Sequence, residues 1–362
     1  DPIGSRGLGD VYKRQESSCD ETAVSIVRLK NKKHGEILSN VIFSQIEEHL
    51  PYGGVVPEIA SRSHVESLGP LIDEALNKAS LKLDDIDGVA ATAGPGLVGG
   101  LIVGLTTAKG ISLGAGIPLI GVNHLEGHAL TPLLTNKVSF PYILLLISGG
   151  HTQLILVKGL GDYVQLGTTL DDAVGEAFDK AAKFLDLGYP GGPALEKVSL
   201  KGSKNKFSFP RPLLKSDDCN FSFSGLKTSL IREVKKIEPL TETDLSDLAA
   251  SYQQAIIDCL ITKPNNAISK VEKEYHDLDI KYFVAAGGVA SNKAIGKSLN
   301  NLALQNNMEF VAPPIQFCTD NAAMVAWTGG LRLLSGQKDN LEIPVRPRWP
   351  LEEMRINGDS YE

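Results

Sequence analysis

Two histidines and a distant aspartate are the residues best suited to hold a metal ion. H124-L-E-G-H128 places two imidazoles four residues apart, which puts them on one face of a helix and close enough to share a metal. Asp320, in C318-T-D-N-A-A323, would add a carboxylate, and two His with one carboxylate and open positions suit Zn or Fe(II). Two alternatives stay open: helical histidines are often surface or core residues, and an aspartate at a helix start is commonly an N-cap.

Two glycine-rich turns could bind an anion. S148-G-G-H151 and G287-G-V-A-S-N292 each follow an apolar run of strand length, and each can direct backbone N–H groups at a phosphate. The second turn ends in an Asn that can bind a sugar hydroxyl or a phosphate, so the pair indicates a nucleotide site. The alternative is that the glycines serve only the geometry of tight turns.

An acidic segment lies between these turns in the sequence. L170-D-D-A-V-G-E-A-F-D-K180 places four carboxylates on a predicted helix, shortly before Y189-P-G-G-P193. The simplest interpretation is a solvated acidic helix face. If a nucleotide binds nearby, Asp179 becomes a candidate ligand of its ribose.

Residues 196–236 form a basic segment, with ten Lys or Arg against four Asp or Glu. Four phenylalanines are interleaved with these charges, at 207, 209, 221 and 223. A basic face with aromatic side chains suits RNA phosphates and unstacked bases. The alternative is a solvated connector whose phenylalanines belong to the core.

The elements that must position these residues alternate between short apolar runs and helix-period segments, which predicts an α/β protein. Strands are expected at residues 23–29, 86–92, 118–122, 141–147, 153–157 and 281–286. Helices are expected over residues 65–79, from about 101, from 124, over 171–187, after 292 and over 320–334. The run 141–157 reads as a hairpin with a glycine tip.

Length and composition narrow the classes of function. A chain of 362 residues suggests two domains, at about 150 residues each. The formal charge of −7 argues against general coating of nucleic acid or anionic membrane but permits a local basic patch. Four cysteines without a C-x-x-C pair favour a reducing cytosol. The uncharged window 89–108 contains Pro95 and five glycines, so we predict a strand, a loop and a packed helix there instead of a membrane span.

Nine motifs, taken in order from Glu16 to about Arg348, resemble the tRNA N6-adenosine threonylcarbamoyltransferase family. They are E16-S-S-C-D-E-T22, G94-P-G-L-V-G-G100, N123-H-L-E-G-H128, S148-G-G-H-T152, D172-A-V-G-E-A-F-D-K180, Y189-P-G-G-P193, F221-S-F-S-G-L-K227, G287-G-V-A-S-N292 and T319-D-N-A322. The archaeal and eukaryotic branch tends to have a tyrosine two residues before S-G-G, where Leu146 stands here. The chain is therefore similar to the bacterial or organellar branch.

The resemblance implies a two-lobed actin/Hsp70-like (ASKHA) ATPase fold with a nucleotide cleft between the lobes. We expect a first lobe over 1–139, a second over 140–321 with a helical, basic insertion at 165–240, and a final helix and tail over 322–362 that packs back on the first lobe. The implied activity is transfer of a threonylcarbamoyl group from threonylcarbamoyl-AMP to N6 of adenosine 37, in tRNAs that read codons beginning with A.

The same resemblance implies roles for individual residues. The metal ligands would be His124, His128 and Asp320, and the metal would be one divalent ion, Fe2+ favoured over Zn2+. The adenylate would be held by Ile147, Ser148, Gly149, Gly150, His151, Asp179, Gly192 and Asn292. The exocyclic amine of adenosine is a poor nucleophile, and a carboxylate could take its proton late. Asp20 is the candidate for this polar group, with Glu21 as an alternative.

The partners expected from the resemblance are tRNA, a paralogous partner subunit and a small ATPase, in the cytoplasm and without a membrane. Whether the chain also forms a homodimer is left open. Residues 196–236 are expected to help hold the tRNA.

Three rival functions can be weighed on the same residues. A zinc peptidase of the H-E-x-x-H type needs its general base directly after the first histidine, where Leu125 stands, with Glu126 one position later. A metal-dependent ATPase or sugar kinase of the same superfold is supported by the paired glycine turns, although fold alone does not decide function. A noncatalytic, chaperone-like binder would lack turnover of the acyl-adenylate.

The opening segment departs from the family. The family enters its first motif from a short apolar strand at the centre of the first lobe, but residues 9–15 read G-D-V-Y-K-R-Q. A central strand is normally apolar on both faces. We therefore predict that residues 1 to about 15 are not native sequence and that the native segment is an apolar strand.

Overall fold

The computed structural model describes residues 10–52, 54–136 and 138–354, and side chains from Glu16 onward within them. The chain divides into two compact units. Unit 1 comprises Asp1–Lys137 with Asp320–Glu362, and unit 2 comprises Val138–Thr319. The last helix of the chain therefore belongs to the same unit as the first strands.

Unit 1 is built on a five-stranded sheet in the order β3-β2-β1-β4-β5. The strands are β1 (Asp10–Glu16), β2 (Glu21–Asn31), β3 (His34–Ser44), β4 (Gly88–Gly94) and β5 (Leu119–Asn123). β1 pairs antiparallel with β2 and parallel with β4, and β4 pairs parallel with β5. Every residue of β4 and β5 is buried, as expected for strands covered on both faces. The strands predicted at 23–29, 86–92 and 118–122 are confirmed, whereas β3 was not predicted.

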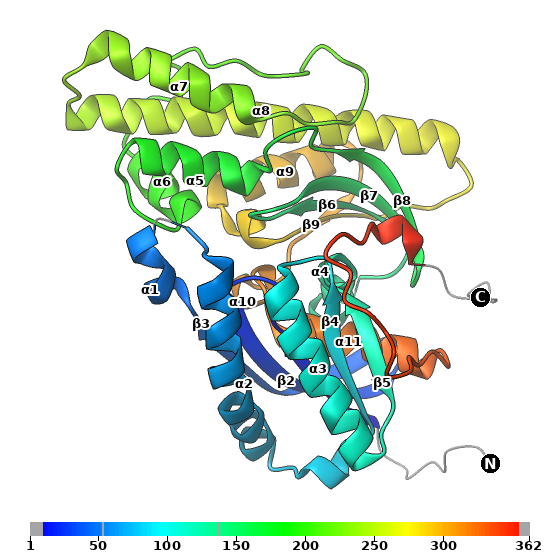
Figure 1. Cartoon of the computed structure of the whole chain (residues 1–362). Coiled ribbons are helices and arrows are strands. Elements are labelled where there is room, and N and C mark those ends of the chain that lie inside the picture. The colour runs from blue at the N-terminus through cyan, green and yellow to red at the C-terminus, as the bar shows by residue number, and fades with distance from the viewer. Residues whose placement is uncertain (1–9, 53, 137, 355–362) are drawn as a thin grey trace. The chain divides into compact units, whose positions relative to one another are not determined.

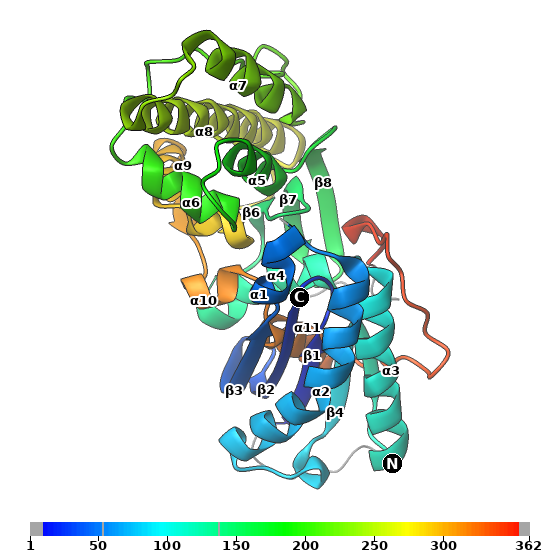
Figure 2. The same cartoon turned by 60° about the vertical axis from the view of Figure 1, so that its left-hand side comes forward.

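Helices cover both faces of this sheet (Figures 1 and 2). α2 (Pro57–Ala79) and α3 (Val98–Ala115) pack against β2, β3 and β4 from one side, and α11 (Ala322–Leu334) packs against β1, β2, β4 and β5 with α4 (His124–Thr135) beside it. The sequence explains α2 well: Pro57 stands in its first turn, and Leu68, Leu71 and Ala75 form the apolar stripe that it buries. The short helices are α1 (Ile46–His49), η1 (Leu50–Tyr52), η2 (Leu83–Asp85) and η4 (Leu351–Glu353).

Among the described residues, α3 is the one helix whose length and apolar composition would suffice to cross a membrane. It packs on β4 and α2 in unit 1, and it buries Gly100, Leu101, Gly104, Leu105 and Ala108. The strand, loop and packed helix predicted over residues 89–108 are confirmed.

The opening segment supplies the central strand of unit 1. β1 runs from Asp10 to Glu16, and its backbone pairs with Ala23–Leu29 on one side and with Gly88–Ala91 on the other. Residues 1–9 and the side chains of residues 10–15 lie outside the described part of the chain. The hypothesis that this segment is not native therefore stays a prediction.

Unit 2 contains a second five-stranded sheet, in the order β10-β9-β6-β7-β8. Its strands are β6 (Tyr142–Ile147), β7 (Thr152–Gly159), β8 (Asp162–Thr168), β9 (Tyr282–Ala286) and β10 (Glu309–Val311). The hairpin predicted over residues 141–157 is confirmed by the antiparallel pairing of β6 with β7. β9 lies parallel to β6, which requires a long crossover connection between them, and the helices between the two strands supply it.

The helices of unit 2 include one of 33 residues, α8 (Glu242–Glu274), which was not predicted. It begins with a capping box between Thr241 and Asp244, and it packs against α6, α7 and α9. The others are α5 (Val174–Phe184), α6 (Gly191–Ser199), α7 (Ser224–Ile237), η3 (Gly288–Ser291), α9 (Lys293–Gln305) and α10 (Ile315–Cys318). Figure 1 shows α5, α7 and α8 stacked over the sheet, and residues of these helices share one hydrophobic core with the sheet.

Candidate functional site

The predicted helix at His124 starts directly at the end of β5. Asn123 is its N-cap, and the side-chain oxygen of Asn123 accepts from the backbone N–H of Leu125 at 2.9 Å. The end of β5 therefore fixes where α4 begins. The i, i+4 spacing on this helix places the rings of His124 and His128 4.7 Å apart, measured between centroids. Both side chains are buried.

Asp320 meets these histidines from a distant part of the sequence. Its Oδ1 lies 3.1 Å from Nε2 of His128 and 3.4 Å from Nε2 of His124. The alternative that Asp320 caps the following helix is wrong, because α11 begins at Ala322 and the side chain of Asn321 accepts from Met324 N. With Asn321 as the N-cap, the carboxylate of Asp320 turns to the imidazoles.

Glu16 lies behind His124 and was not singled out from the sequence. Its Oε2 is 3.3 Å from Nδ1 of His124 and accepts from Thr92 Oγ1 at 2.6 Å, while its Oε1 accepts from Ser18 N at 2.7 Å. The side chain is completely buried. A carboxylate behind a metal-binding histidine commonly fixes its tautomer. The signal available in the sequence was that Glu16 opens the first family motif, directly after the position of the family's apolar strand.

The segment that carries Glu16 is seated on the glycines of α3. Ser17 Oγ donates to the carbonyl of Gly100 at 2.9 Å. A Cβ on Gly100 would lie 2.2 Å from the carbonyl oxygen of Ser17, and one on Gly104 would lie 2.2 Å from Ser17 Oγ. Glycine is needed at these positions because the backbone of Ser17 lies against α3. The motif G94-P-G-L-V-G-G100 therefore helps to position the segment that carries Glu16.

Electrostatics at this cluster favour a positive charge at its centre. Burial disfavours ionisation of His124, but the carboxylates of Asp320 and Glu16 outweigh it and raise the pKa of His124 well above its usual value. Burial likewise opposes ionisation of the acids, yet His124 holds the pKa of Asp320 well below, and that of Glu16 below, the ordinary value. The two carboxylates therefore favour positive charge next to the imidazole of His124.

Asp20 and Glu21 lie near the same cluster. Asp20 is buried, and burial together with the charges of Asp320 and Asp20 raises the pKa of Glu21 well above its usual value. The neighbouring negative charges and burial therefore both favour the neutral form of Glu21. The assignment of Asp20 as the group facing the acyl end stays a prediction.

The ligand atoms fit a divalent metal ion. One nitrogen from each of His124 and His128 and one carboxylate oxygen of Asp320 lie within 4.8 Å of one another. Two imidazoles and one carboxylate are a donor set that suits Fe(II) and Zn(II). Because both Nε2 atoms face Asp320 and Nδ1 of His124 faces Glu16, the Nε2 atoms are the ones available to a metal.

The two glycine turns of unit 2 lie side by side. β6 and β9 are parallel neighbours, with Leu146 opposite Ala286, so the turns leave the same edge of the sheet. Gly287 has a φ of +95°, and a Cβ there would lie 2.4 Å from the carbonyl oxygen of Ile147, so this position requires glycine. Gly149, in contrast, has open space around its Cβ position.

The start of α5 packs on the first of these turns. Gly175 N donates to the carbonyl of Ser148 at 3.2 Å, and His151 N donates to Ser148 Oγ at 3.2 Å. The backbone of the turn is thereby held between β6, β7 and α5. A Cβ on Gly150 would meet open space, so the predicted ligands 147–151 combine a fixed backbone with room beside it.

The acidic segment is not simply a solvated face. Lys180 forms ion pairs with Asp172 and Glu176, both at 2.8 Å. Asp179 Oδ1 accepts from Gly191 N at 2.8 Å, in the first turn of α6. A Cβ on Gly192, the next residue, would meet open space. Asp179 and Gly192, both predicted to bind the adenylate, thus come together at one helix start.

Asn292 is placed at the N-terminus of α9. Its Oδ1 accepts from Ile295 N at 3.0 Å, and its Nδ2 donates to Gln253 Oε1 at 2.9 Å. The side chain thus caps the helix that follows the second glycine turn. Any contact of Asn292 with a nucleotide would add to this structural role.

The phenylalanines of the basic segment belong to the core. Phe209, Phe221 and Phe223 are buried and Phe207 is half-buried, so the alternative that the phenylalanines belong to the core is confirmed for the first three, which cannot stack on unpaired bases. Arg211 forms an ion pair with Asp258 at 2.8 Å. All eight lysines of the segment are exposed, namely Lys197, Lys201, Lys204, Lys206, Lys215, Lys227, Lys235 and Lys236.

Comparison with known proteins relates the chain to one family over most of its length. The family model described as TsaD, tRNA N6-adenosine threonylcarbamoyltransferase, matches residues 36–327. The tRNA N6-adenosine threonylcarbamoyltransferases of Brucella suis (strain ATCC 23445 / NCTC 10510) and Brucella canis (strain ATCC 23365 / NCTC 10854 / RM-666) are each 54% identical over 338 residues, which cover 93% of this chain and 94% of the relative.

Solved structures with low sequence identity share the fold. The activator of the 2-hydroxyisocaproyl-CoA dehydratase from Clostridium difficile with bound ADPNP has a TM-score of 0.50 at 14% identity, over 91% of this chain and 95% of that one. Full-length HypF in its phosphate- and nucleotide-bound form has a TM-score of 0.57 at 12% identity, over 90% of this chain and 56% of that one. The predicted actin/Hsp70-like α/β class is confirmed.

Proposed function

The chain belongs to the tRNA N6-adenosine threonylcarbamoyltransferase family, and from that premise we propose that it transfers the threonylcarbamoyl group of threonylcarbamoyl-AMP to N6 of adenosine 37 in tRNAs that read codons beginning with A. The observation that carries the proposal is the cluster of His124, His128 and Asp320, which places a metal-binding donor set where the family motifs fall. The chain is a transferase of the tRNA modification class.

His124, His128 and Asp320 would hold one divalent ion, Fe2+ favoured over Zn2+. When bound, such an ion polarises a carbonyl oxygen as a Lewis acid. Glu16 holds the imidazole of His124 through Nδ1 and keeps its Nε2 on the ligand side. Asp20 would accept the proton that leaves the exocyclic amine of adenosine, with Glu21 beside it as the alternative.

The residues of unit 2 would bind the adenylate. Three features support this: the adjacent turns at the ends of β6 and β9, the open space beside Gly149 and Gly150, and the open space at Gly192 in the first turn of α6. Backbone N–H groups at such turns and helix starts bind phosphate. Asp179, fixed by Gly191 N, would contact the ribose, and Asn292 would contact the nucleotide from the second turn.

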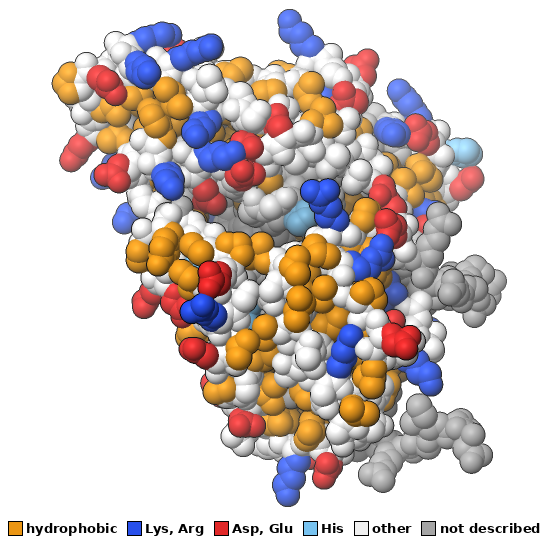
Figure 3. Space-filling view, in the orientation of Figure 1, with side chains coloured by type: hydrophobic (Ala, Val, Ile, Leu, Met, Phe, Trp, Pro, Cys, Tyr) orange, Lys and Arg blue, Asp and Glu red, His pale blue; other side chains and the backbone are white. Residues whose placement is uncertain are grey.

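The partners we propose are tRNA, a paralogous subunit and a small ATPase, in the cytoplasm. An exposed apolar surface in unit 1 supports a protein partner. Figure 3 shows hydrophobic side chains gathered over the part of the surface formed by α2 and α3, where Val65 is 65% exposed, Ile102 48% and Leu113 71%. Side chains of this kind grouped together commonly mark a protein interface.

The rival functions fit the structure less well. Glu126 stands one position after the place that the general base occupies in H-E-x-x-H. It is fully buried, and Arg332 donates to both of its carboxylate oxygens at 2.6 Å. Its carboxylate is therefore committed to a buried ion pair and cannot activate water. An ATPase or kinase shares the fold, but neither requires the pair of histidines on α4.

The proposal is tested with the purified chain, the adenylate-forming enzyme, threonine, bicarbonate, ATP and unmodified tRNA, with the modified nucleoside measured by mass spectrometry. His124→Ala and Asp320→Ala are expected to lose bound metal, by elemental analysis, and most transfer. His34→Ala removes an exposed histidine of the same unit and serves as the control. Full metal content in both site variants would overturn the ligand assignment, and absence of product with the wild-type chain would overturn the function.

A further inference from the structure

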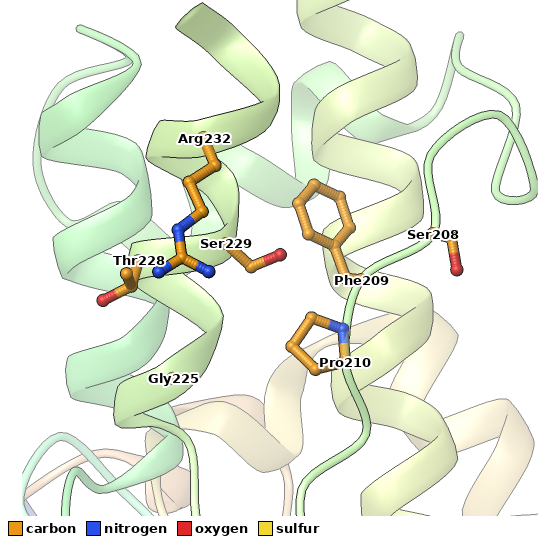
Figure 4. A pocket seen from close by; sticks show the side chains of 7 residues that line it. All are labelled: Ser208, Phe209, Pro210, Gly225, Thr228, Ser229 and Arg232. Carbon is orange, nitrogen blue, oxygen red and sulfur yellow. The ribbon is translucent and has the colours of Figure 1, made fainter. Parts of the chain in front are cut away.

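Unit 2 contains a cavity away from the glycine turns in sequence, within the basic segment. It is a hollow of about 600 Å3 that is open to solvent, because most of the residues that line it are exposed. Figure 4 shows its two walls, one from α7 and one from the chain before Arg211. The lining residues are Ser208, Phe209, Pro210, Gly225, Thr228, Ser229 and Arg232.

The α7 wall follows from the periodicity of the helix. Leu226, Leu230 and Val234 are buried in the core, so positions 225, 228, 229 and 232 fall on a different face, with spacings of three and four that make them neighbours. The first turn of this helix is fixed by Asp171, whose Oδ1 accepts from Phe223 N at 2.8 Å. The wall is therefore held in place before any ligand binds.

The opposite wall is fixed as well. Arg211 donates to the carbonyl of Phe209 at 2.6 Å and to Asp258 on α8 at 2.9 Å. The ring of Phe209 packs edge-on against Tyr252, with 5.6 Å between centroids. The ring of Pro210 is left exposed beside it, as a flat apolar surface at the edge of the cavity.

The polar groups that line the cavity are suited to an anion. In Figure 4 the hydroxyl of Ser229 points toward the wall of Phe209 and Pro210, whereas the hydroxyl of Thr228 points away from it, so the guanidinium of Arg232 and one hydroxyl are the polar donors on the α7 wall. None of the seven described residues that line the cavity is Asp or Glu, while the neighbouring Lys227 and Lys235 are exposed on the same helix. Arginine with hydroxyl donors is a frequent way to bind phosphate.

We propose that this cavity binds one nucleotide of the tRNA, with its phosphate on Arg232 and Ser229 and its sugar or base against Pro210. The inference rests on the proposed function, which supplies an RNA substrate, and it gives the basic segment a defined contact in place of stacked phenylalanines. The surrounding excess of lysines favours a polyanion over an isolated phosphate. The combination of a phosphate site with an apolar wall favours a nucleotide over an acidic peptide.

Two variants test the cavity by different physical routes. Arg232→Gln removes the charge, and Gly225→Leu keeps the charge but fills the space, because a Cβ at Gly225 meets nothing within 4 Å. Lys297→Gln is the matched control, since Lys297 is exposed on α9 of the same unit and lies outside the basic segment. Binding of unmodified tRNA is measured as a function of salt, and transfer is measured at limiting and saturating tRNA.

We expect Arg232→Gln and Gly225→Leu each to weaken tRNA binding about tenfold, with the KM for tRNA raised and transfer at saturating tRNA retained. Arg232→Gln should also reduce the slope of log affinity against log salt by about 1, for one lost phosphate contact. Lys297→Gln should change affinity less than twofold. Melting temperatures within a few degrees of wild type establish that the variants are folded.

Unchanged tRNA affinity in both cavity variants, in a chain whose wild type transfers normally, overturns the cavity assignment and leaves the proposed function standing. Equal losses in Arg232→Gln and Lys297→Gln without a loss in Gly225→Leu also overturn it, because they show a diffuse charge effect. A wild-type chain that binds no tRNA and forms no product overturns both.

Discussion

The sharpest consequence of the structure concerns Glu16, because its carboxylate decides which nitrogen of His124 carries the proton. Oε1 accepts from the Ser18 backbone N–H, which cannot reverse its direction, and Oε2 faces Thr92 Oγ1 and His124 Nδ1. In Glu16→Gln the amide oxygen must stay on Ser18 N. The amide nitrogen then points at His124 and donates to Nδ1, which drives the proton to Nε2 and blocks the nitrogen that faces Asp320.

The size of the effect follows from that tautomer change. Loss of a partner behind a metal ligand typically lowers metal affinity 10- to 100-fold, or about 1.4–2.7 kcal/mol. The hydroxyl of Ser18, 3.1 Å from His124 Nδ1, can accept from Nδ1 in place of the carboxylate, which sets the lower end of the range. The substitution preserves side-chain volume in a fully buried position, so no cavity is opened.

Metal affinity is measured by titrating metal-free protein with Zn2+, and anaerobically with Fe2+, in competition with a chelator. Glu58→Gln is the control, since Glu58 is exposed on α2 of the same unit and pairs only at the surface with Arg62. A Glu16→Gln protein that melts normally and binds either metal within threefold of wild type would refute the tautomer argument, whatever happens to its activity.

Three further predictions follow from other parts of the chain. Gly149→Val should reduce the affinity for the adenylate at least tenfold in calorimetry, because its side chain enters space that is open in the protein, whereas Gly296→Ala, at a second open position, should leave affinity unchanged. Burial raises the pKa of Cys259 to about 11 from 9.0, so its thiol favours folding fully below pH 9, and this contribution is lost as the pH rises toward 11; thermal melts should show a smaller alkaline decline in Cys259→Ala, and equal declines would contradict this. Replacing residues 8–15 by an alternating Val, Leu and Ile strand should raise both the melting temperature and turnover, and equal values would show that the printed segment suffices.

Much of the fold was accessible from the sequence because its strands are buried on both faces. Runs such as 141–147 are apolar throughout, and the turns after them contain glycine, so strand, turn and helix start could be located without structure. β3 was missed because its pattern of burial is irregular and it carries Asn40 and Glu36 among its apolar residues. The helix α8 was missed because it contains Pro264 and Lys263, both buried within its span.

Lys263 shows why such a helix resists prediction from periodicity. Its Nζ donates to the carbonyls of Ser216 and Asp218, at 2.8 and 3.0 Å, and the side chain is 1% exposed. A buried lysine that binds a distant loop interrupts the apolar stripe in the sequence, although its side chain is packed inside the protein like an apolar one. Only the tertiary structure supplies the partners that make this burial favourable.

The three metal ligands of the candidate site were predicted from the sequence, but the residues that position these ligands, such as Glu16 and Asn321, were not. Spacing alone identifies His124 and His128, because four residues along a helix is a local relation. Asp320 was ambiguous between ligand and N-cap, since a helix start accepts either Asp or Asn as its cap. The neighbouring Asn321 takes the cap, and that leaves the carboxylate unused by its own helix.

The same division of labour recurs at His124, where Asn123 caps α4 and leaves the histidine side chain directed away from the helix start. In both cases a capping asparagine adjoins a candidate metal ligand. The asparagine accepts from the backbone N–H groups at the helix start, and the neighbouring side chain is left available to bind the metal. Asn321→Ala tests this directly, because the uncapped helix would compete for the Asp320 carboxylate. Metal affinity should then fall even though no ligand is changed, whereas Asn306→Ala, at the far end of α9, should leave it unaltered. Unchanged metal affinity in Asn321→Ala would mean that Asp320 is held by the histidines alone, and that the cap is incidental to the site.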